Sequence, residues 1–240
     1  MERAVDTQPL GLGRRTSETV SENRMLDCLS PDELSQLMAV SDLTSFVADA
    51  RIAVGGDVIR EIYFPVSGYA SLMITGSEES SVQVAFAGRE GILGWESLLG
   101  RESFLLDIYV PEALKALRVD VGEFLIRAAA NEHWRNVQFK YVAGLFTVVA
   151  RGVLCARFHV LEARLARCLL EVSDRHAEIP ILLTQNTLAK LLGVRRSGVT
   201  NAATHLQLLG LIQYRRGEIR LLDRKGLEAA ACECYRFDVH

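Results

Sequence analysis

The chain has 240 residues, of which 49% are hydrophobic, and a formal net charge of −3, so it can bury sizeable cores in one or two domains. An acidic net charge with a basic C-terminal end favours a soluble regulator over a protein that coats nucleic acid along its whole length. No apolar run reaches the roughly 18–20 residues of a membrane span, the N-terminus lacks the apolar centre of a signal peptide, and five cysteines without regular spacing favour a reducing cytoplasm.

The N-terminal part of the chain predicts a mobile tail followed by short helices. Residues 1–22 are polar and contain two glycines and a proline, which is typical of a tail. Asn23–Leu29 predicts a short helix. Ser30 is a good N-cap for a second helix, because Pro31 fits the first helical turn and acidic residues follow it.

From Thr44 to about Val119 the sequence predicts short strands. Eight of the chain's 18 glycines punctuate this region. Brief apolar or alternating runs lie between them, at 52–54, 62–64, 71–74, 82–86 and 108–110. Short strands at such regular spacing predict an antiparallel β-roll that could enclose a small ligand.

A helical texture returns at Asp120–Arg127, and a long helix is predicted over residues 128–158. One stripe of this helix recurs at steps of four and three, which is typical of a seam with a partner helix. We expect this seam to pair two chains across a two-fold axis, although part of it must pack on its own domain. The stripe consists of Trp134, Gln138, Tyr141, Leu145, Val148, Gly152 and Cys155.

The stretch from Thr184 to Leu211 predicts a helix-turn-helix, preceded by an amphipathic helix at His159–Arg175. Thr184 can cap the first helix, whose apolar face carries Leu188, Leu191 and Leu192. Gly193 suits the turn, because a sharp reversal favours a residue that tolerates positive φ. The second helix directs Val199, Ala202 and Leu206 inward. An ordinary helical hairpin remains the alternative.

The residues after the second helix favour a winged helix that binds DNA. Leu211–Leu221 predicts a strand, a glycine turn and a second strand. Between Thr184 and Gly226 there are eight basic and two acidic side chains, a net charge of +6 in a chain whose total is −3. This concentration of positive charge indicates a surface that binds the phosphates of a nucleic acid.

A β-roll, a long helix and a winged helix, in this order, resemble the Crp/Fnr superfamily of bacterial transcription regulators. The most specific segments are Tyr63–Gly68, Gly88–Gly94 and Leu192–Thr200. The resemblance implies an α+β chain with a tail at 1–22, a β-roll sensor at 23–127, a dimerisation helix at 128–158 and a winged helix-turn-helix domain at 159–240. It also implies a homodimer that binds a near-palindromic operator, with RNA polymerase as a further partner.

The same resemblance implies which residues contact DNA. Arg196, Ser197 and Asn201 fall where the family's recognition helix meets base edges. Arginine can read guanine through O6 and N7, whereas asparagine prefers adenine. Phosphate contacts are expected from a second group, which sets register without reading sequence. These are Thr184, Arg195, Thr200, Arg215 and Arg216.

The sensor half departs from the pattern of the cyclic-nucleotide binders. Trp95 stands at the ribose-binding glutamate position, and Phe104 and Leu105 stand where an Arg-Ser pair holds the phosphate. A buried phosphate without a cation is costly, so cyclic AMP is not expected. Glu96 and Arg101 are a short register shift away. The predicted effector pocket consists of Arg89, Glu90, Trp95, Glu96, Phe104 and Leu105.

No other cofactor is predicted. An iron–sulfur cluster needs several N-terminal cysteines, but only Cys28 precedes the long helix, and the sensor half up to Ala130 has no histidine for haem. Cys232 and Cys234 form a suggestive pair without nearby ligands to complete a tetrahedral metal site, so no metal is expected.

The five histidines lie far apart, and no nucleophile–base spacing or phosphate loop is present, so the sequence predicts no enzyme. The leading hypothesis is a cytoplasmic, membrane-free DNA-binding regulator. The alternative is a small-molecule-binding or assembly module whose helix-turn-helix no longer binds DNA.

Overall fold

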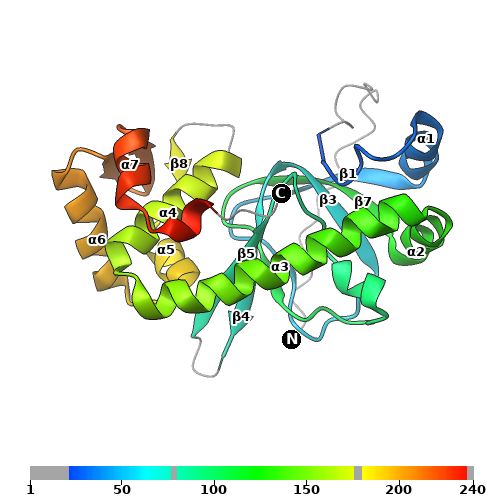
Figure 1. The fold of residues 1–240 in the computed structure, drawn as a ribbon, viewed down its shortest axis with the longest axis horizontal. Coiled ribbons are helices and arrows are strands. Elements are labelled where there is room, and N and C mark those ends of the chain that lie inside the picture. Colours follow the sequence, from blue (N-terminus) through cyan, green and yellow to red (C-terminus); the bar gives the residue numbers. More distant parts are fainter. Residues whose placement is uncertain (1–21, 77–79, 176–179, 237–240) are drawn as a thin grey trace. The chain divides into compact units, whose positions relative to one another are not determined.

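The computed structural model describes residues 22–76, 80–175 and 180–236. Figure 1 follows the chain from the N-terminal helix and strands to the C-terminal helices. The described residues form two compact units. The first comprises residues up to 72 together with 86–144, and the second comprises 73–85 together with the residues from 145 onward. The predicted tail lies outside the described residues, apart from residue 22.

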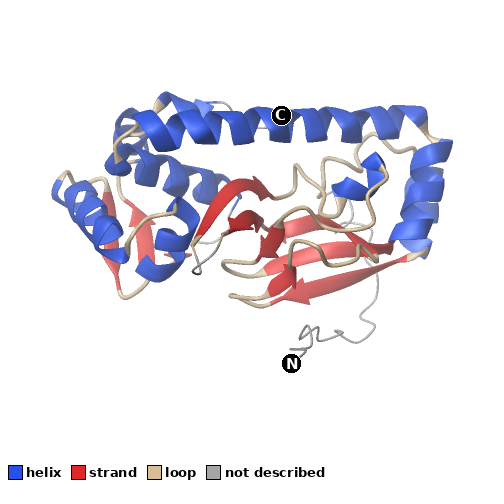
Figure 2. Ribbon diagram, turned by 90° about the horizontal axis from the view of Figure 1, so that it is seen from below, coloured by secondary structure: helices blue, strands red, loops and turns tan. Residues whose placement is uncertain are grey.

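Antiparallel strands form the predicted β-roll, so this part of the fold prediction is confirmed (Figure 2). One sheet has the order β1-β7-β3, in which β7 pairs along its length with β1 from Ser41–Val119 to Phe46–Leu114. The second sheet has the order β2-β6-β4-β5. The strands are β1 (Ser41–Phe46), β2 (Arg51–Ala53), β3 (Glu61–Gly68), β4 (Ala70–Thr75), β5 (Ser81–Ala87), β6 (Asp107–Tyr109) and β7 (Leu114–Asp120). The sequence runs at 52–54, 62–64, 71–74, 82–86 and 108–110 each fall on a strand, whereas β1 and β7 lie outside these runs.

The segment predicted as a helix at Asn23–Leu29 is instead a series of turns. The Asn23 side chain is fully buried, and its Nδ2 donates hydrogen bonds of 2.9 Å to the carbonyls of Pro65 and Gly91. Its Oδ1 accepts from the N–H of Met25. These bonds offer the backbone an alternative to a helix.

The helices of the first unit are α1 (Pro31–Ala39), the 3₁₀ helix η3 (Trp95–Leu99), α2 (Val121–Ala130) and the first part of α3 (Glu132–Phe158), whose residues from 145 onward belong to the second unit. Ser30 caps α1 in a capping box with Glu33, as the sequence predicted. The long helix does not begin at residue 128. Asn131 adopts an extended conformation between α2 and α3, and its Oδ1 accepts from the N–H of Trp134. Asn131 therefore ends α2 and caps α3.

An aromatic cluster holds the start of α3 in the core of the first unit. Trp134 is 1% exposed and stacks on Phe64, with ring centroids 6.2 Å apart. Phe124 meets Trp134 edge to face at 5.6 Å. The indole N–H of Trp134 donates to the carbonyl of Met25 at 2.8 Å. An aromatic pair of this kind contributes about 0.5–1.5 kcal/mol beyond the area that it buries.

Most residues of the predicted dimer seam on α3 are buried within the single chain. Trp134, Tyr141 and Leu145 are 1%, 3% and 5% exposed within the single chain, so they cannot form an exposed surface for a second copy. Gln138 and Cys155 are also buried, while Val148 and Gly152 are half-buried. The exposed apolar side chains of α3 include Phe139, Phe146, Val153, Leu154 and Phe158, of which Phe139, Phe146 and Val153 recur every seven residues and form a separate stripe.

Helix α3 is also long and apolar enough to cross a membrane by length and composition alone, with a mean hydropathy of 1.5 over its most apolar 18-residue window. The sequence prediction missed this, because Gln138 and Lys140 interrupt the apolar residues.

The second unit is built around α4 (Leu161–Arg175). Its Leu165 and Leu169 are fully buried, as are Val199 and Leu227 from later helices. The remaining elements are β8 (Ile181–Leu182), α5 (Gln185–Leu192), α6 (Arg196–Leu208), β9 (Ile212–Arg215), β10 (Glu218–Leu221), α7 (Arg224–Ala230) and the 3₁₀ helix η4 (Glu233–Arg236). The strands form a sheet of order β8-β10-β9, of which the sequence predicted the last two.

Candidate nucleic-acid interface

Helix α5 begins and ends as the sequence predicted. Thr184 is the N-cap, and its hydroxyl accepts from the N–H of Thr187 at 3.1 Å. Gly193 ends the helix with φ 63°, a left-handed conformation that glycine adopts without strain. Leu188 is fully buried. The exposed N-terminal turn of α5 presents backbone N–H groups, which favour an anion.

Helix α6 has one buried and one exposed face. Val199, Ala202 and Leu206 are at most 1% exposed, as expected for the inner face of a recognition helix. The other face begins at the helix N-terminus and carries polar side chains. It contains Arg196, Ser197, Thr200, Asn201 and Thr204, all exposed except the half-buried Thr200. The three residues predicted to read bases therefore share an accessible face.

Gln185 joins the two helices and was not singled out from the sequence. Its Oε1 accepts from the Nε of Arg196 at 3.2 Å and from the hydroxyl of Thr200 at 3.0 Å. Thr200 also donates to the carbonyl of Arg196. Gln185 therefore restrains Arg196. It also bonds to the hydroxyl of Thr200, which the sequence predicts to contact a DNA phosphate.

The wing is a two-residue hairpin. Arg215 of β9 pairs with Glu218 of β10, which leaves Arg216 and Gly217 as the turn. Both have positive φ, 53° and 87° respectively, as a type I′ turn requires. The side chains of Arg215, Arg216 and Arg220 are exposed. The hairpin thus presents arginines at its tip and along its strands.

A polar groove of about 390 Å³ lies between the start of α5, the exposed face of α6 and the wing. Tyr214 fixes the wing beside α6, because its N–H donates to Gln207 Oε1 at 2.7 Å and its hydroxyl donates to the carbonyl of Leu183 at 2.9 Å. Burial raises the pKa of Tyr214 to about 12, so the phenol keeps its proton at neutral pH. The lining residues are Thr184, Gln185, Asn186, Arg196, Thr200, Ala203, Thr204, Gln207, Tyr214, Arg216 and Gly217.

The Crp-like helix-turn-helix domain family matches residues 163–230, which contain α5, α6 and the wing. We refer to this matching part of the chain as the Crp-like domain. The resemblance read from the sequence is therefore confirmed for the part of the chain that carries the groove.

Solved structures extend the likeness of the Crp-like domain to most of the chain. FixK2 from Bradyrhizobium japonicum has a TM-score of 0.69 at 19% identity, covering 80% of this chain and 98% of its own. The c-di-GMP-responsive global regulator CLP from Xanthomonas campestris has a TM-score of 0.65 at 14% identity, covering 80% of this chain and 99% of its own. A CooA mutant from Carboxydothermus hydrogenoformans has a TM-score of 0.61 at 16% identity, covering 90% of this chain and 97% of its own. At these identities the likeness establishes the fold. No curated protein sequence matches the chain.

Some basic side chains of the Crp-like domain form ion pairs within the chain, whereas others are exposed to solvent. Arg224 belongs to the basic segment, but its guanidinium bonds to Asp174 at 2.6 Å and to Glu228 at 2.9 Å. It is absent from the residues that line the groove. Arg195, Arg215 and Arg220 are exposed beside Arg196 and Arg216 along the chain. The exposed arginines of this domain other than Arg224 therefore lie at the corner of α6 and on the wing.

The predicted effector residues are only partly brought together. Trp95 and Phe104 are buried, whereas Leu105 is exposed. Glu96 is 2% exposed, and its Oε1 accepts from the N–H of Leu105 at 3.1 Å. Burial raises the pKa of the Glu96 carboxyl above its usual range.

Two of the predicted effector residues form hydrogen bonds with backbone groups. The Nε of Arg89 donates to the carbonyl of Glu22 at 2.7 Å. Glu90 Oε1 accepts from the N–H of Gly88 at 3.2 Å. Arg89 therefore contacts the N-terminal segment, and its Nε does not serve a pocket around Glu96.

Proposed function

We propose that the chain is a non-enzymatic DNA-binding transcription regulator that acts as a homodimer on a near-palindromic operator. The single observation that carries this proposal is the polar groove bordered by the exposed face of α6 and the arginine-bearing wing. The match to a Crp-like helix-turn-helix domain supports the same class of function.

The proposed mechanism places α6 in the major groove. Arg196, Ser197 and Asn201 face the base edges, because they occupy the exposed N-terminal half of the helix. Arg195 and the wing arginines, Arg215 and Arg216, meet phosphates on either side. The N–H groups at the start of α5, next to Thr184, face a further phosphate. Base contacts specify the sequence, and phosphate contacts fix the register.

We propose that the second chain covers the exposed apolar stripe of α3. Phe139, Phe146 and Val153 recur every seven residues and are 39%, 75% and 69% exposed. This heptad spacing is typical of a helix pair. A spanning helix needs apolar side chains all round, whereas the exposed Lys140 and Arg157 interrupt the surface of α3, so a partner helix fits better than lipid. A two-fold axis would set two α6 helices one turn of DNA apart.

The sensor half, in this proposal, does not take cyclic AMP, and neither haem nor an iron–sulfur cluster is expected in it. The buried Trp95 and Phe104 supply no cation for a phosphate. A cytoplasmic location and contact with RNA polymerase complete the proposal.

Operator selection from random duplex DNA, followed by titration at several salt concentrations, tests the function. We expect a selected sequence that binds more tightly than random DNA, with an affinity that falls steeply as salt rises. The exposed arginine Arg101 lies outside the Crp-like domain, so Arg101→Ala should bind like the unmutated protein. Failure to bind any duplex at low salt would favour the alternative, an assembly module with a helix-turn-helix that no longer binds DNA.

A further inference from the structure

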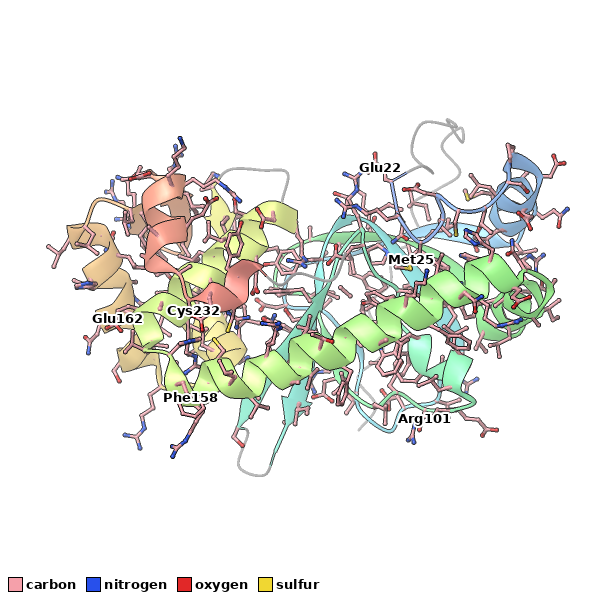
Figure 3. The ribbon with its side chains drawn as sticks, in the orientation of Figure 1. Glu22, Met25, Arg101, Phe158, Glu162 and Cys232 are labelled. Atoms are coloured by element: carbon pink, nitrogen blue, oxygen red, sulfur yellow. The ribbon has the colours of Figure 1, made fainter. Side chains whose placement is uncertain are left out.

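A cluster of thiols and an imidazole lies in the second unit, outside the groove. Cys155 belongs to the last turn of α3, and His159 lies in the turn between α3 and α4. Cys232 follows α7, and Cys234 belongs to η4. Figure 3 shows Cys232 beside this turn, near Phe158. The cluster therefore joins two parts of the chain that are 77 residues apart.

Two distances within this cluster match those between the ligands of a metal ion. Cys155 Sγ and Cys232 Sγ are 3.6 Å apart, and Cys234 Sγ lies 3.7 Å from His159 Nδ1. All four ligand atoms lie within 4.8 Å of one another. A tetrahedral zinc ion with Zn–S of about 2.3 Å and Zn–N of about 2.0 Å separates two sulfur ligands by about 3.8 Å and a sulfur and a nitrogen ligand by about 3.5 Å. We propose that Cys155, His159, Cys232 and Cys234 bind one structural zinc ion.

The partner of His159 supports this assignment. The Nε2 atom of His159 lies 3.3 Å from Glu233 Oε1, while its Nδ1 faces Cys234. A zinc-bound histidine typically donates its other ring N–H to a carboxylate, which fixes the tautomer and the ring orientation. His159 would therefore bind through Nδ1 and donate from Nε2, with Glu233 as a positioning residue.

The surroundings of the cluster distinguish it from a core of inert thiols. Cys155, Cys232 and Cys234 are 1%, 7% and 5% exposed, and buried cysteine commonly behaves as a small apolar residue. Here, however, the thiols share their site with an imidazole. By contrast, the buried Cys168 is not among the described residues that could hold a metal ion.

The chemistry of binding follows from the donor set. The three thiols release their protons to solvent and bind as thiolates, and His159 binds as the neutral imidazole, so the occupied site has a net charge of −1. Zinc would fasten η4 to the junction of α3 and α4. The same segment is already anchored by Tyr235, whose hydroxyl donates to Asp174 at 2.9 Å. Because the ion binds the folded state, removing it should lower the stability of the domain.

Elemental analysis of the full-length protein, purified without added metal or chelator, tests the site. We expect one zinc ion per chain, lost in Cys232→Ser and Cys234→Ser and retained in the matched control Cys28→Ser, whose thiol lies in the first unit. Glu233→Gln should keep zinc but release it faster to a chelator. Zinc removal should lower the unfolding temperature of the unmutated protein, and zinc addition should restore it.

Titration of the zinc-free, unmutated protein with Co²⁺ avoids any variant that fails to fold. A Cys₃His site should give the visible d–d bands of tetrahedral cobalt and thiolate charge-transfer bands, saturating at one ion per chain. Octahedral cobalt without these bands would overturn the proposal. So would zinc content that is equal in the unmutated and Cys234→Ser proteins, an iron–sulfur chromophore, or a Cys155–Cys232 disulfide in protein purified under nitrogen.

Discussion

The Nε atom of Arg196 donates a hydrogen bond of 3.2 Å to Oε1 of Gln185. This bond joins the first residue of α6 to the first residue of α5. Because it uses Nε, it restrains the guanidinium and leaves the two Nη groups for a guanine. The restraint lowers the side-chain entropy that Arg196 would lose on binding.

Loss of Arg196 should therefore remove sequence information. We expect Arg196→Ala to weaken binding to the selected operator by about 1–3 kcal/mol and binding to unrelated DNA much less. Fluorescence anisotropy on both duplexes measures the two losses. Gln185→Ala should give a smaller loss in the same direction. Equal losses on both duplexes for Arg196→Ala would show that another residue reads the base.

Loss of Arg216 should weaken binding to every sequence alike. Its φ of 53° places the side chain at the tip of the wing, where a backbone phosphate is the expected partner. Arg216→Ala should reduce the slope of log affinity against log salt by about 0.9, because the variant makes one phosphate contact fewer and therefore releases fewer counterions on binding. Alanine also carries a Cβ, so the turn keeps its strain. An unchanged slope, with Arg101→Ala as the control, would remove Arg216 from the interface.

Local patterns were sufficient to predict the helix-turn-helix. Thr184 and Gly193 each act within one helical turn, and Val199 lies on a periodic apolar face, so neighbours in sequence determine their roles. The role of Gln185 could not be predicted in this way, since its partners lie 11 and 15 residues away. The cluster of Cys155 and His159 with the C-terminal cysteines was missed for the same reason.

Periodicity identified the long helix but not the direction of its apolar faces. Apolar side chains occupy two stripes of α3, and the spacing is the same in both. Only the tertiary packing reveals that Leu145 is buried within the chain and that Phe146 is exposed. The break at Asn131 was also missed, because it depends on a side-chain bond to the N–H of Trp134.

Cyclic AMP should not bind tightly to the sensor half. Trp95 and Phe104 are buried, and neither can neutralise a phosphate. Isothermal calorimetry at neutral pH should give only heats of dilution. A saturable, micromolar isotherm with one nucleotide per chain would instead assign the contacts to Glu96 and Arg101, one short register shift away.

Stability should depend on the ionisation of Glu96. Burial raises the pKa of this carboxyl, so its folded-state value lies above the unfolded value of about 4.3. The stability that the protonated carboxyl contributes to the folded state is fully present below the unfolded pKa and is lost as pH rises through the folded pKa. Glu96→Gln keeps an oxygen that can accept from the N–H of Leu105 but carries no charge. Thermal unfolding should show equal stability near pH 4 and a growing advantage for Glu96→Gln toward pH 8. A constant difference across that range would show that Glu96 does not titrate in this way.

The face of α3 that meets a second chain can be tested by paired substitutions at adjacent positions. Phe146 is 75% exposed and Leu145 is 5% exposed. Phe146→Glu should yield a folded monomer, because it places a charge in the proposed interface without disturbing the core. Leu145→Glu should instead lower the unfolding temperature sharply, because it buries a charge. Sedimentation velocity and circular dichroism separate the two effects. Lys140→Glu is the control for charge alone, since Lys140 is exposed away from the stripe. If Phe146→Glu stays dimeric while Leu145→Glu becomes a folded monomer, the interface lies on the face first predicted from the sequence.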